Sequence, residues 1–113
     1  KDAAFNLGRM GLLVAGLADH HRLVREATED RLHQSARAPL FAEASYLLRA
    51  LVDAGALASS WSGAGPSLVA FCTEASAREV RAEGERLLAS AGVAGEALLL
   101  RADREGLVVT DSK

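Results

Sequence analysis

The sequence has little cysteine, few aromatic residues and no long apolar run, and each scarcity excludes a class of protein. A single cysteine, Cys72, excludes an intramolecular disulfide and is typical of a reducing compartment. Aromatic residues make up 4% of the chain and the net charge is −2, which argues against nucleic-acid binding. No apolar run approaches the roughly 20 residues that a membrane span requires. We therefore expect a cytoplasmic protein that binds neither nucleic acid nor membrane.

The sequence does contain enough material for one folded domain. Its 113 residues are one domain's worth, and half of them are hydrophobic, which suffices for a packed core. The chain opens inside a predicted helix and without an initiator methionine. We therefore expect it to be part of a longer polypeptide.

Hydrophobic periodicity predicts three helices, two strands, one helix and two strands, in that order. The fourth helix has the most regular apolar stripe, at Val80, Gly84, Leu87, Leu88 and Ala91. In the first helix, apolar residues recur every three or four positions at Leu7, Met10, Val14 and Leu17. Asp19 is a plausible N-cap for the second helix, and Thr73 and Ser76 offer caps for the fourth. Gly55 is expected to end the third helix and Gly92 the fourth. The order predicts an α+β fold with helices on one face of a mostly antiparallel sheet. The helices are expected over residues 3–18, 20–33, 41–54 and from the Thr73 and Ser76 caps to 91, and the strands over 56–61, 67–72, 96–102 and 107–110.

A glycine-rich turn, residues 60–67, separates the first two strands. Gly63, Gly65 and Pro66 cannot continue a helix or a regular strand. Glycines also let another group approach the backbone, and successive N–H groups can then converge on an anion such as a phosphate. The turn lacks the lysine of a P-loop, so its spacing alone favours a purely structural connection.

The three histidines do not predict a metal or catalytic site. His20 and His21 would point about 100° apart on a helix, which makes a shared metal ion unfavourable. No carboxylate or cysteine stands at matching spacing, so no metal site is predicted. His33 is predicted to pack structurally, because nothing places it beside a nucleophile. No catalytic residue is predicted in this chain, and Asn6 and Arg9 are expected to face solvent by default.

Three stretches carry a family resemblance: residues 2–9 (DAAFNLGR), 29–40 (EDRLHQSARAPL) and 62–67 (SGAGPS). Together they resemble the C-terminal domain of homoserine kinases, members of the GHMP small-molecule kinase superfamily. The glycine motif is shared across that superfamily. The Asp-Arg-Leu-His-Gln run followed by an arginine points to homoserine kinases over mevalonate or galactose kinases. The resemblance covers residues 1–113 and implies a ferredoxin-like two-layer sandwich with a four-stranded sheet.

The resemblance implies transfer of the ATP γ-phosphate to the hydroxyl of L-homoserine, a step in threonine biosynthesis. In the family, an N-terminal domain carries the glycine- and serine-rich loop that cradles the ATP phosphates. No stretch of this chain matches the Pro-x-x-x-Gly-Leu-Gly-Ser-Ser pattern of that loop. ATP with magnesium is therefore expected to be held mainly by the missing domain, and this chain alone is expected to be inactive. The expected partners are L-homoserine and that N-terminal domain; a homodimer is a further assembly that we leave open.

The resemblance also assigns roles to individual residues. Arg37 matches the family arginine that holds the substrate carboxylate, for which a planar guanidinium fork is well suited. Ser62, Gly63, Ala64 and Gly65 match the motif whose loop lies against the nucleotide-phosphate loop of the other domain. If these residues share one cleft, Arg37 must lie on the side of the domain that bears the glycine-rich turn.

Two other functions stay open on the sequence. The chain departs from the family at Ser35 and Ala36, where a Pro-Tyr pair is common, and this leaves the fine specificity open. Another GHMP kinase of a small alcohol would share the loop at 62–67 but would not need Arg37. A non-catalytic ferredoxin-like module that binds an amino acid as a regulatory sensor is the third hypothesis.

Overall fold

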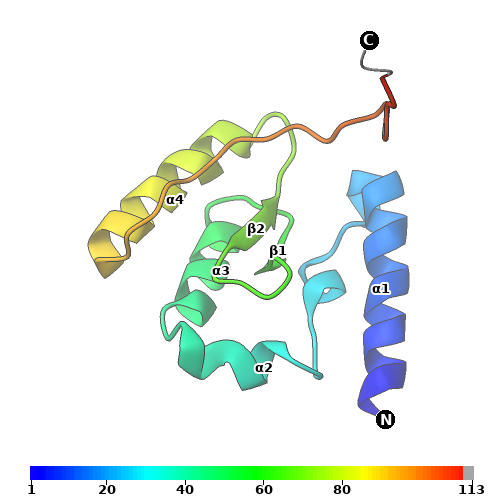
Figure 1. Ribbon diagram of the computed structural model, residues 1–113, viewed down its shortest axis with the longest axis horizontal. Helices are drawn as coiled ribbons and strands as arrows, with labels where there is room; N and C mark the ends of the chain where they lie inside the picture. Colours follow the sequence, from blue (N-terminus) through cyan, green and yellow to red (C-terminus); the bar gives the residue numbers. More distant parts are fainter. Residues whose placement is uncertain (111–113) are drawn as a thin grey trace.

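The computed structural model describes residues 1–110 and surrounds one two-stranded sheet with helices (Figure 1). The helix α1 opens the chain on one side of the molecule, and α4 lies on the opposite side, with the sheet and α3 between them. The elements are α1 (Asp2–Ala18), the 3₁₀ helices η1 (His20–Arg22) and η2 (Arg25–Thr28), α2 (Gln34–Arg37), the 3₁₀ helix η3 (Ala38–Leu40), α3 (Ala44–Asp53), β1 (Ala58–Trp61), β2 (Leu68–Phe71) and α4 (Ala77–Ala91).

The strand β1 is the centre of the packed core. It pairs antiparallel with β2, with Ala58 opposite Phe71 and Trp61 opposite Leu68. It also contacts η2 on one side and α3 on the other. Ala58 has no exposed surface and packs with Leu23 and Ala27. Ala58 and Ala27 are small, so β1 and η2 approach closely, and Leu23 packs beside them.

Glycines end α3 and α4 as the sequence predicts. Gly55, two residues after α3, has a φ of +111°, and Gly92, directly after α4, has a φ of +65°. These left-handed conformations suit glycine because it has no Cβ. Along α4, Val80 and Leu87 of the predicted apolar stripe are buried. The helices expected at 3–18, 41–54 and up to 91 are thus confirmed with shifts of up to three residues at their ends.

The predicted helix over residues 20–33 is wrong. Two short 3₁₀ helices occupy part of this segment, and Asp19 caps η1 by accepting a hydrogen bond from the backbone N–H of His21. Between them Leu23 and Val24 are extended. Leu23 packs so tightly on α1 that a Cβ at Gly16 would lie 2.6 Å from its side chain. The segment carries few apolar residues, so its path follows these core contacts in preference to a regular helix.

Two further expectations on this half of the chain need correction. From the sequence, residues 34–40 are expected to interrupt the helical pattern, because Pro39 disfavours the helical conformation at Ala38. Instead α2 and η3 follow one another there, and Ala38 has helical dihedral angles. Pro39 lies in the first turn of η3, where its missing N–H costs no hydrogen bond.

The four-stranded ferredoxin-like sandwich is also not what the described residues form. The sheet of residues 1–110 has two strands, and residues 96–102 and 107–110 pair with neither. Arg81 donates from Nε to the carbonyl of Ala97 at 2.8 Å, and the N–H of Ala97 donates to Glu85 at 3.2 Å. These bonds hold the segment against α4, along which the chain runs back in Figure 1, and away from the sheet edge. An alternating apolar pattern predicts a strand only where a sheet edge is available to pair with it.

Two smaller expectations concern Cys72 and membrane insertion. Cys72 follows β2 in a partly buried position, and burial raises the pKa of its thiol. This agrees with its predicted place as a small hydrophobic residue. Across the described part of the chain, no helix combines the length and apolar character needed to cross a membrane.

Candidate functional site

The carboxylate of Asp30 joins α1 to the start of α2. Its side chain is only 8% exposed. It accepts hydrogen bonds from the backbone N–H groups of Leu32 at 3.0 Å, His33 at 2.8 Å and Gln34 at 2.6 Å. It also accepts one from the side-chain amide of Asn6 on α1. The first N–H groups of a helix have no partner within it, so the bond from Gln34, the first residue of α2, together with those from the two residues before it, fixes where α2 begins.

The partners of Asp30 are tied down in turn. The amide oxygen of Asn6 accepts from the N–H of Arg31 at 3.0 Å, so Asn6 uses both ends of its side chain. Gln34 donates from Nε2 to the carbonyl of Thr28 at 2.9 Å. The exposed ring of His33 lies with Nδ1 2.5 Å from the Asp30 carboxylate. Asn6 is therefore a structural bridge, and the expectation that it faces solvent is wrong. The contact with Asp30 gives His33 a structural role, as expected, although its ring stays exposed.

The environment of Asp30 lowers the pKa of its carboxyl group well below the ordinary range. Desolvation by burial raises this pKa, but the hydrogen bonds from Asn6 and from the N–H groups of Gln34, Leu32 and His33 lower it more. All of these donors favour the charged form. Asp30 is therefore ionised in the folded protein at neutral pH and is a structural anion.

Arg37, the last residue of α2, reaches the glycine-rich turn. Its Nη1 donates a hydrogen bond to the backbone carbonyl of Ala64. The two residues are 27 positions apart, so the contact is tertiary. A guanidinium has five N–H donors, and the bond to Ala64 uses one of them. The structure thus brings Arg37 to the side of the domain that bears residues 62–65, as the shared-cleft hypothesis requires.

The turn itself is held by backbone bonds and by one aromatic ring. The N–H of Ser62 donates to the carbonyl of Ser67 at 2.9 Å, and the N–H of Gly65 donates to the carbonyl of Ser62 at 3.1 Å. Gly63 and Gly65 have left-handed φ values of +55° and +79°. The N–H groups of Ser62 and Gly65 are used in hydrogen bonds within the turn. An anion bound by residues 62–65 would therefore accept hydrogen bonds from the N–H groups of Gly63 and Ala64.

The indole of Trp61 explains why position 65 must be glycine. A Cβ at Gly65 would lie 2.5 Å from the Trp61 ring. Trp61 is buried and makes an edge-to-face contact with Phe41, with 6.1 Å between ring centroids. At Gly63, by contrast, a Cβ would meet nothing within 4 Å. The base of the turn is therefore packed, whereas its tip leaves the backbone open to a ligand.

Arg9 on α1 is a further cation whose side chain is largely covered by the rest of the chain. Its Nη2 lies 3.2 Å from Glu29, and its guanidinium lies over the Phe5 ring, which Arg31 also covers. The Nε of Arg9 is buried without a hydrogen-bond partner in the described chain. A buried, unsatisfied donor is costly, so the ion pair with Glu29 and the contact with the Phe5 ring have to offset this cost. The expectation that Arg9 faces solvent is therefore wrong; the i, i+4 spacing of Phe5 and Arg9 is the sequence signal for their contact.

The hollows of the surface do not by themselves select this site. A hollow of about 400 Å³ is lined by the α1 and Asp30 region, including Phe5, Arg31 and Gln34. A larger one of about 620 Å³ lies between α3 and α4, and none of the predicted site residues line it. The site hypothesis therefore depends on the contact between Arg37 and Ala64.

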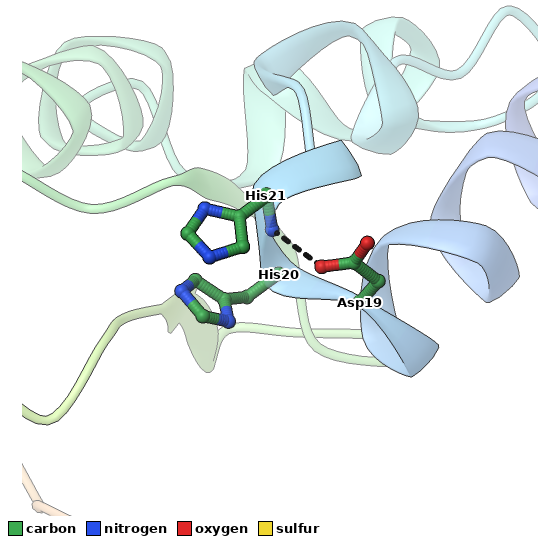
Figure 2. A group of neighbouring side chains, drawn as sticks. All are labelled: Asp19, His20 and His21. Atoms are coloured by element: carbon green, nitrogen blue, oxygen red, sulfur yellow. Dashed lines mark hydrogen bonds between the residues drawn. The ribbon is translucent and has the colours of Figure 1, made fainter.

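The cluster of Asp19, His20 and His21 differs from what the sequence predicts (Figure 2). The two imidazole rings lie 4.0 Å apart at their centroids, because η1 is a single 3₁₀ turn and not part of a regular helix. The possible ligand atoms of the three residues all lie within 4.8 Å of one another. The argument that the histidines diverge is therefore wrong. The Asp19 carboxylate, however, already accepts from the His21 N–H at 3.2 Å, as Figure 2 shows, and pairs with Arg22 at 3.4 Å, so it serves the turn.

Sequence comparison relates this chain to a known protein family. Residues 3–89 match the family described as GHMP kinases C terminal. The chain is 38% identical over 109 residues to a homoserine kinase of Desulfitobacterium hafniense, covering 96% of this chain and 37% of that protein. It is 41% identical over 110 residues to a homoserine kinase of Leifsonia xyli subsp. xyli, covering 96% of this chain and 33% of that protein. The chain thus spans about a third of the length of these relatives. No solved structure matches it.

Replacing Asp30 with asparagine tests the role of its charge. At pH 7 we expect Asp30→Asn to lower the free energy of unfolding by about 2–3 kcal/mol, because the amide satisfies fewer of the donors and carries no charge. Folding lowers the pKa of Asp30, so this stabilisation is present above the pKa of the unfolded chain and is lost as the pH falls. The difference between wild type and variant, measured by urea denaturation, should therefore shrink below about pH 4. A difference that is constant down to pH 2 would contradict the charged role.

Two alanine substitutions in the turn separate backbone strain from packing. Gly63→Ala should cost about 1 kcal/mol, because only the left-handed φ opposes it. Gly65→Ala should cost about 2–4 kcal/mol, because its methyl group also collides with the Trp61 ring. Trp61 is the one tryptophan of the chain, so its fluorescence follows unfolding in denaturant directly. Equal costs at the two positions would show that Trp61 does not restrict the turn.

Proposed function

Because this chain belongs to the C-terminal family of GHMP kinases, we propose that it is the substrate-side portion of an ATP-dependent homoserine kinase. The reaction is transfer of the γ-phosphate of ATP to the side-chain hydroxyl of L-homoserine, a step in threonine biosynthesis. The proposal is supported by relatives named homoserine kinase that align with 96% of this chain. The observation that carries the roles of individual residues is the hydrogen bond from Arg37 to Ala64.

In this proposal Arg37 binds the carboxylate of L-homoserine. A planar guanidinium can donate two parallel hydrogen bonds to a carboxylate, which fixes the orientation of the substrate as well as its charge. The bond to Ala64 holds the side chain at the edge of the turn, so it is oriented before the substrate arrives. Preorganisation of this kind reduces the entropy lost on binding.

The turn at residues 62–65 supports the phosphate side of the cleft. Phosphoryl transfer depends mainly on positioning the groups and on neutralising phosphate charge. The open backbone at Gly63 permits a close approach by the phosphate loop of another domain or by the nucleotide itself. ATP with magnesium is held mainly by the N-terminal domain, which is the partner of this chain in the complete protein. Each part carries only some of the groups, so this chain alone does not catalyse.

The function is tested with the complete protein and with this chain alone. We expect the complete protein to phosphorylate L-homoserine with ATP and magnesium, and to prefer it to mevalonate and galactose by at least about 100-fold in kcat/KM, because the arginine fork selects a carboxylate next to the reacting alcohol. A coupled assay of ADP release measures this. The chain of residues 1–113 should show no turnover and no tight binding of L-homoserine in calorimetry.

Two outcomes would overturn the proposal in favour of its alternatives. Preference for an alcohol without a carboxylate would indicate another GHMP kinase. Tight binding of L-homoserine or L-threonine by residues 1–113 without ATP would indicate a regulatory amino-acid-binding module.

Substitution of Arg37 tests its role in the complete protein. Arg37→Ala should raise KM for L-homoserine about 10- to 100-fold, since a charge-assisted pair with the carboxylate contributes about 1.5–3 kcal/mol. The KM for ATP should change less than about 3-fold, because the nucleotide does not use this guanidinium. Arg37→Lys should recover only part of the loss, because an ammonium group lacks the planar fork.

The matched control for Arg37 is Arg49→Ala, which removes an exposed arginine from α3. It should leave both KM values unchanged. Equal KM values for L-homoserine in wild type and Arg37→Ala would remove Arg37 from the site.

A further inference from the structure

The helix α1 is apolar on nearly all sides, yet one broad face of it is exposed. Leu7, Met10, Val14 and Leu17 form a stripe along the helix, and their exposed fractions lie between 57% and 74%. We call these four residues the α1 stripe. Their periodicity predicts the helix, yet each of these four residues is more than half exposed in the described structure.

The polar residues of α1, in contrast to its apolar stripe, are covered by the rest of the chain. After Asp2, the polar side chains of α1 are Asn6 and Arg9, and both are partly buried by the rest of the chain. Asn6 is bonded to Asp30, and Arg9 is paired with Glu29. Leu13 and Gly16 lie on the same inner side, against the core around Leu23. The outer side is therefore left with apolar residues alone, and a helix that is apolar all round is normally buried on all sides.

The size of the α1 stripe indicates which kind of partner covers it. The α1 stripe runs from Leu7 to Leu17, about 15 Å along the helix, so with a width of about 10 Å it offers roughly 150 Å². A stable complex of two separate molecules buries about 800 Å² on each partner, so the α1 stripe alone is too small to form a homodimer. A segment of the same polypeptide needs no such area, because it is held nearby at high effective concentration.

The length of the relatives indicates that such a segment exists. The chain covers about a third of the curated homoserine kinases, and the matched family is described as their C-terminal part. Resting on the proposed function, we propose that the α1 stripe is the face on which the N-terminal part of the same polypeptide packs. The α1 helix would then touch the N-terminal part with one face and Asp30 with the other. The packing would set the distance between the N-terminal nucleotide site and Arg37.

The test measures thiol accessibility in the complete protein. Val14→Cys and Met10→Cys are small changes on the stripe, and Arg22→Cys is the control, since the Arg22 side chain is 74% exposed. Each thiol is labelled with iodoacetamide, and its rate is read by mass spectrometry of the peptide that contains it. We expect both stripe thiols to react at least about 100-fold more slowly than the control in the native protein, and at similar rates in denaturant.

Three readouts decide the result. Stripe thiols that react as fast as the control would overturn the proposal. Protection that disappears on dilution, together with a dimer in analytical ultracentrifugation, would overturn it in favour of a second copy. Protection that is independent of concentration, with cross-links from the Val14→Cys thiol to residues outside 1–113, would support it. Either variant alone suffices if the other does not fold, as judged by circular dichroism.

Failure of this inference is distinguishable from failure of the proposed function. Labelling is measured without substrates and does not depend on which alcohol is phosphorylated. A protected stripe in a protein that does not phosphorylate L-homoserine would refute the function alone. A freely reactive stripe in an active homoserine kinase would refute the packing alone.

Discussion

The carboxylate of Asp30 is the contact on which the arrangement of the candidate site depends. It accepts hydrogen bonds from Asn6 on α1 and from the N–H of Gln34, the first residue of α2, so it sets the position of one helix against the other. The helix α2 is a single turn long and carries Arg37 at its end. A helix this short has little stability of its own and depends on contacts such as these. The hydrogen bond from Arg37 to Ala64 therefore depends on a carboxylate that never touches the turn itself.

This arrangement divides the site between a packed support and an open edge. Trp61 fills the space under Gly65, whereas the backbone at Gly63 is accessible. Arg37 connects the two by its bond to Ala64. A kinase needs such a division, because a phosphate must approach the backbone closely while the groups around it stay in place. In the whole protein, the exposed face of α1 would hold the N-terminal part of the polypeptide against this one, so that the groups of the site keep their positions.

Much of the fold could be predicted because its patterns are local. The stripe of α4 and the glycines Gly55 and Gly92 predict helices and their ends correctly, since these depend on residues within one turn of each other. The predictions failed where distant residues compete. Residues 20–33 are charged enough for a solvated helix, but Leu23 is drawn into the core. Residues 96–102 alternate like a strand, but Ala97 is bonded to α4. For the site, the motif resemblance points to Arg37. The expectation that Arg9 and Asn6 face solvent fails, because helical periodicity does not indicate whether a polar face of a helix is covered by the rest of the chain.

By itself, the sequence determined that α1, α3 and α4 are helical, where the sharp turn lies and which family motifs the chain carries. Each of these follows from residues that are neighbours along the chain, whose hydrogen bonds and allowed dihedral angles involve no distant partner. Only the tertiary structure decided that Arg37 meets Ala64, 27 positions away, and that Asn6 serves Asp30. It also decided which face of α1 is covered. These contacts depend on how the helices pack around β1, and packing is a property of the whole set of side chains that no local pattern contains.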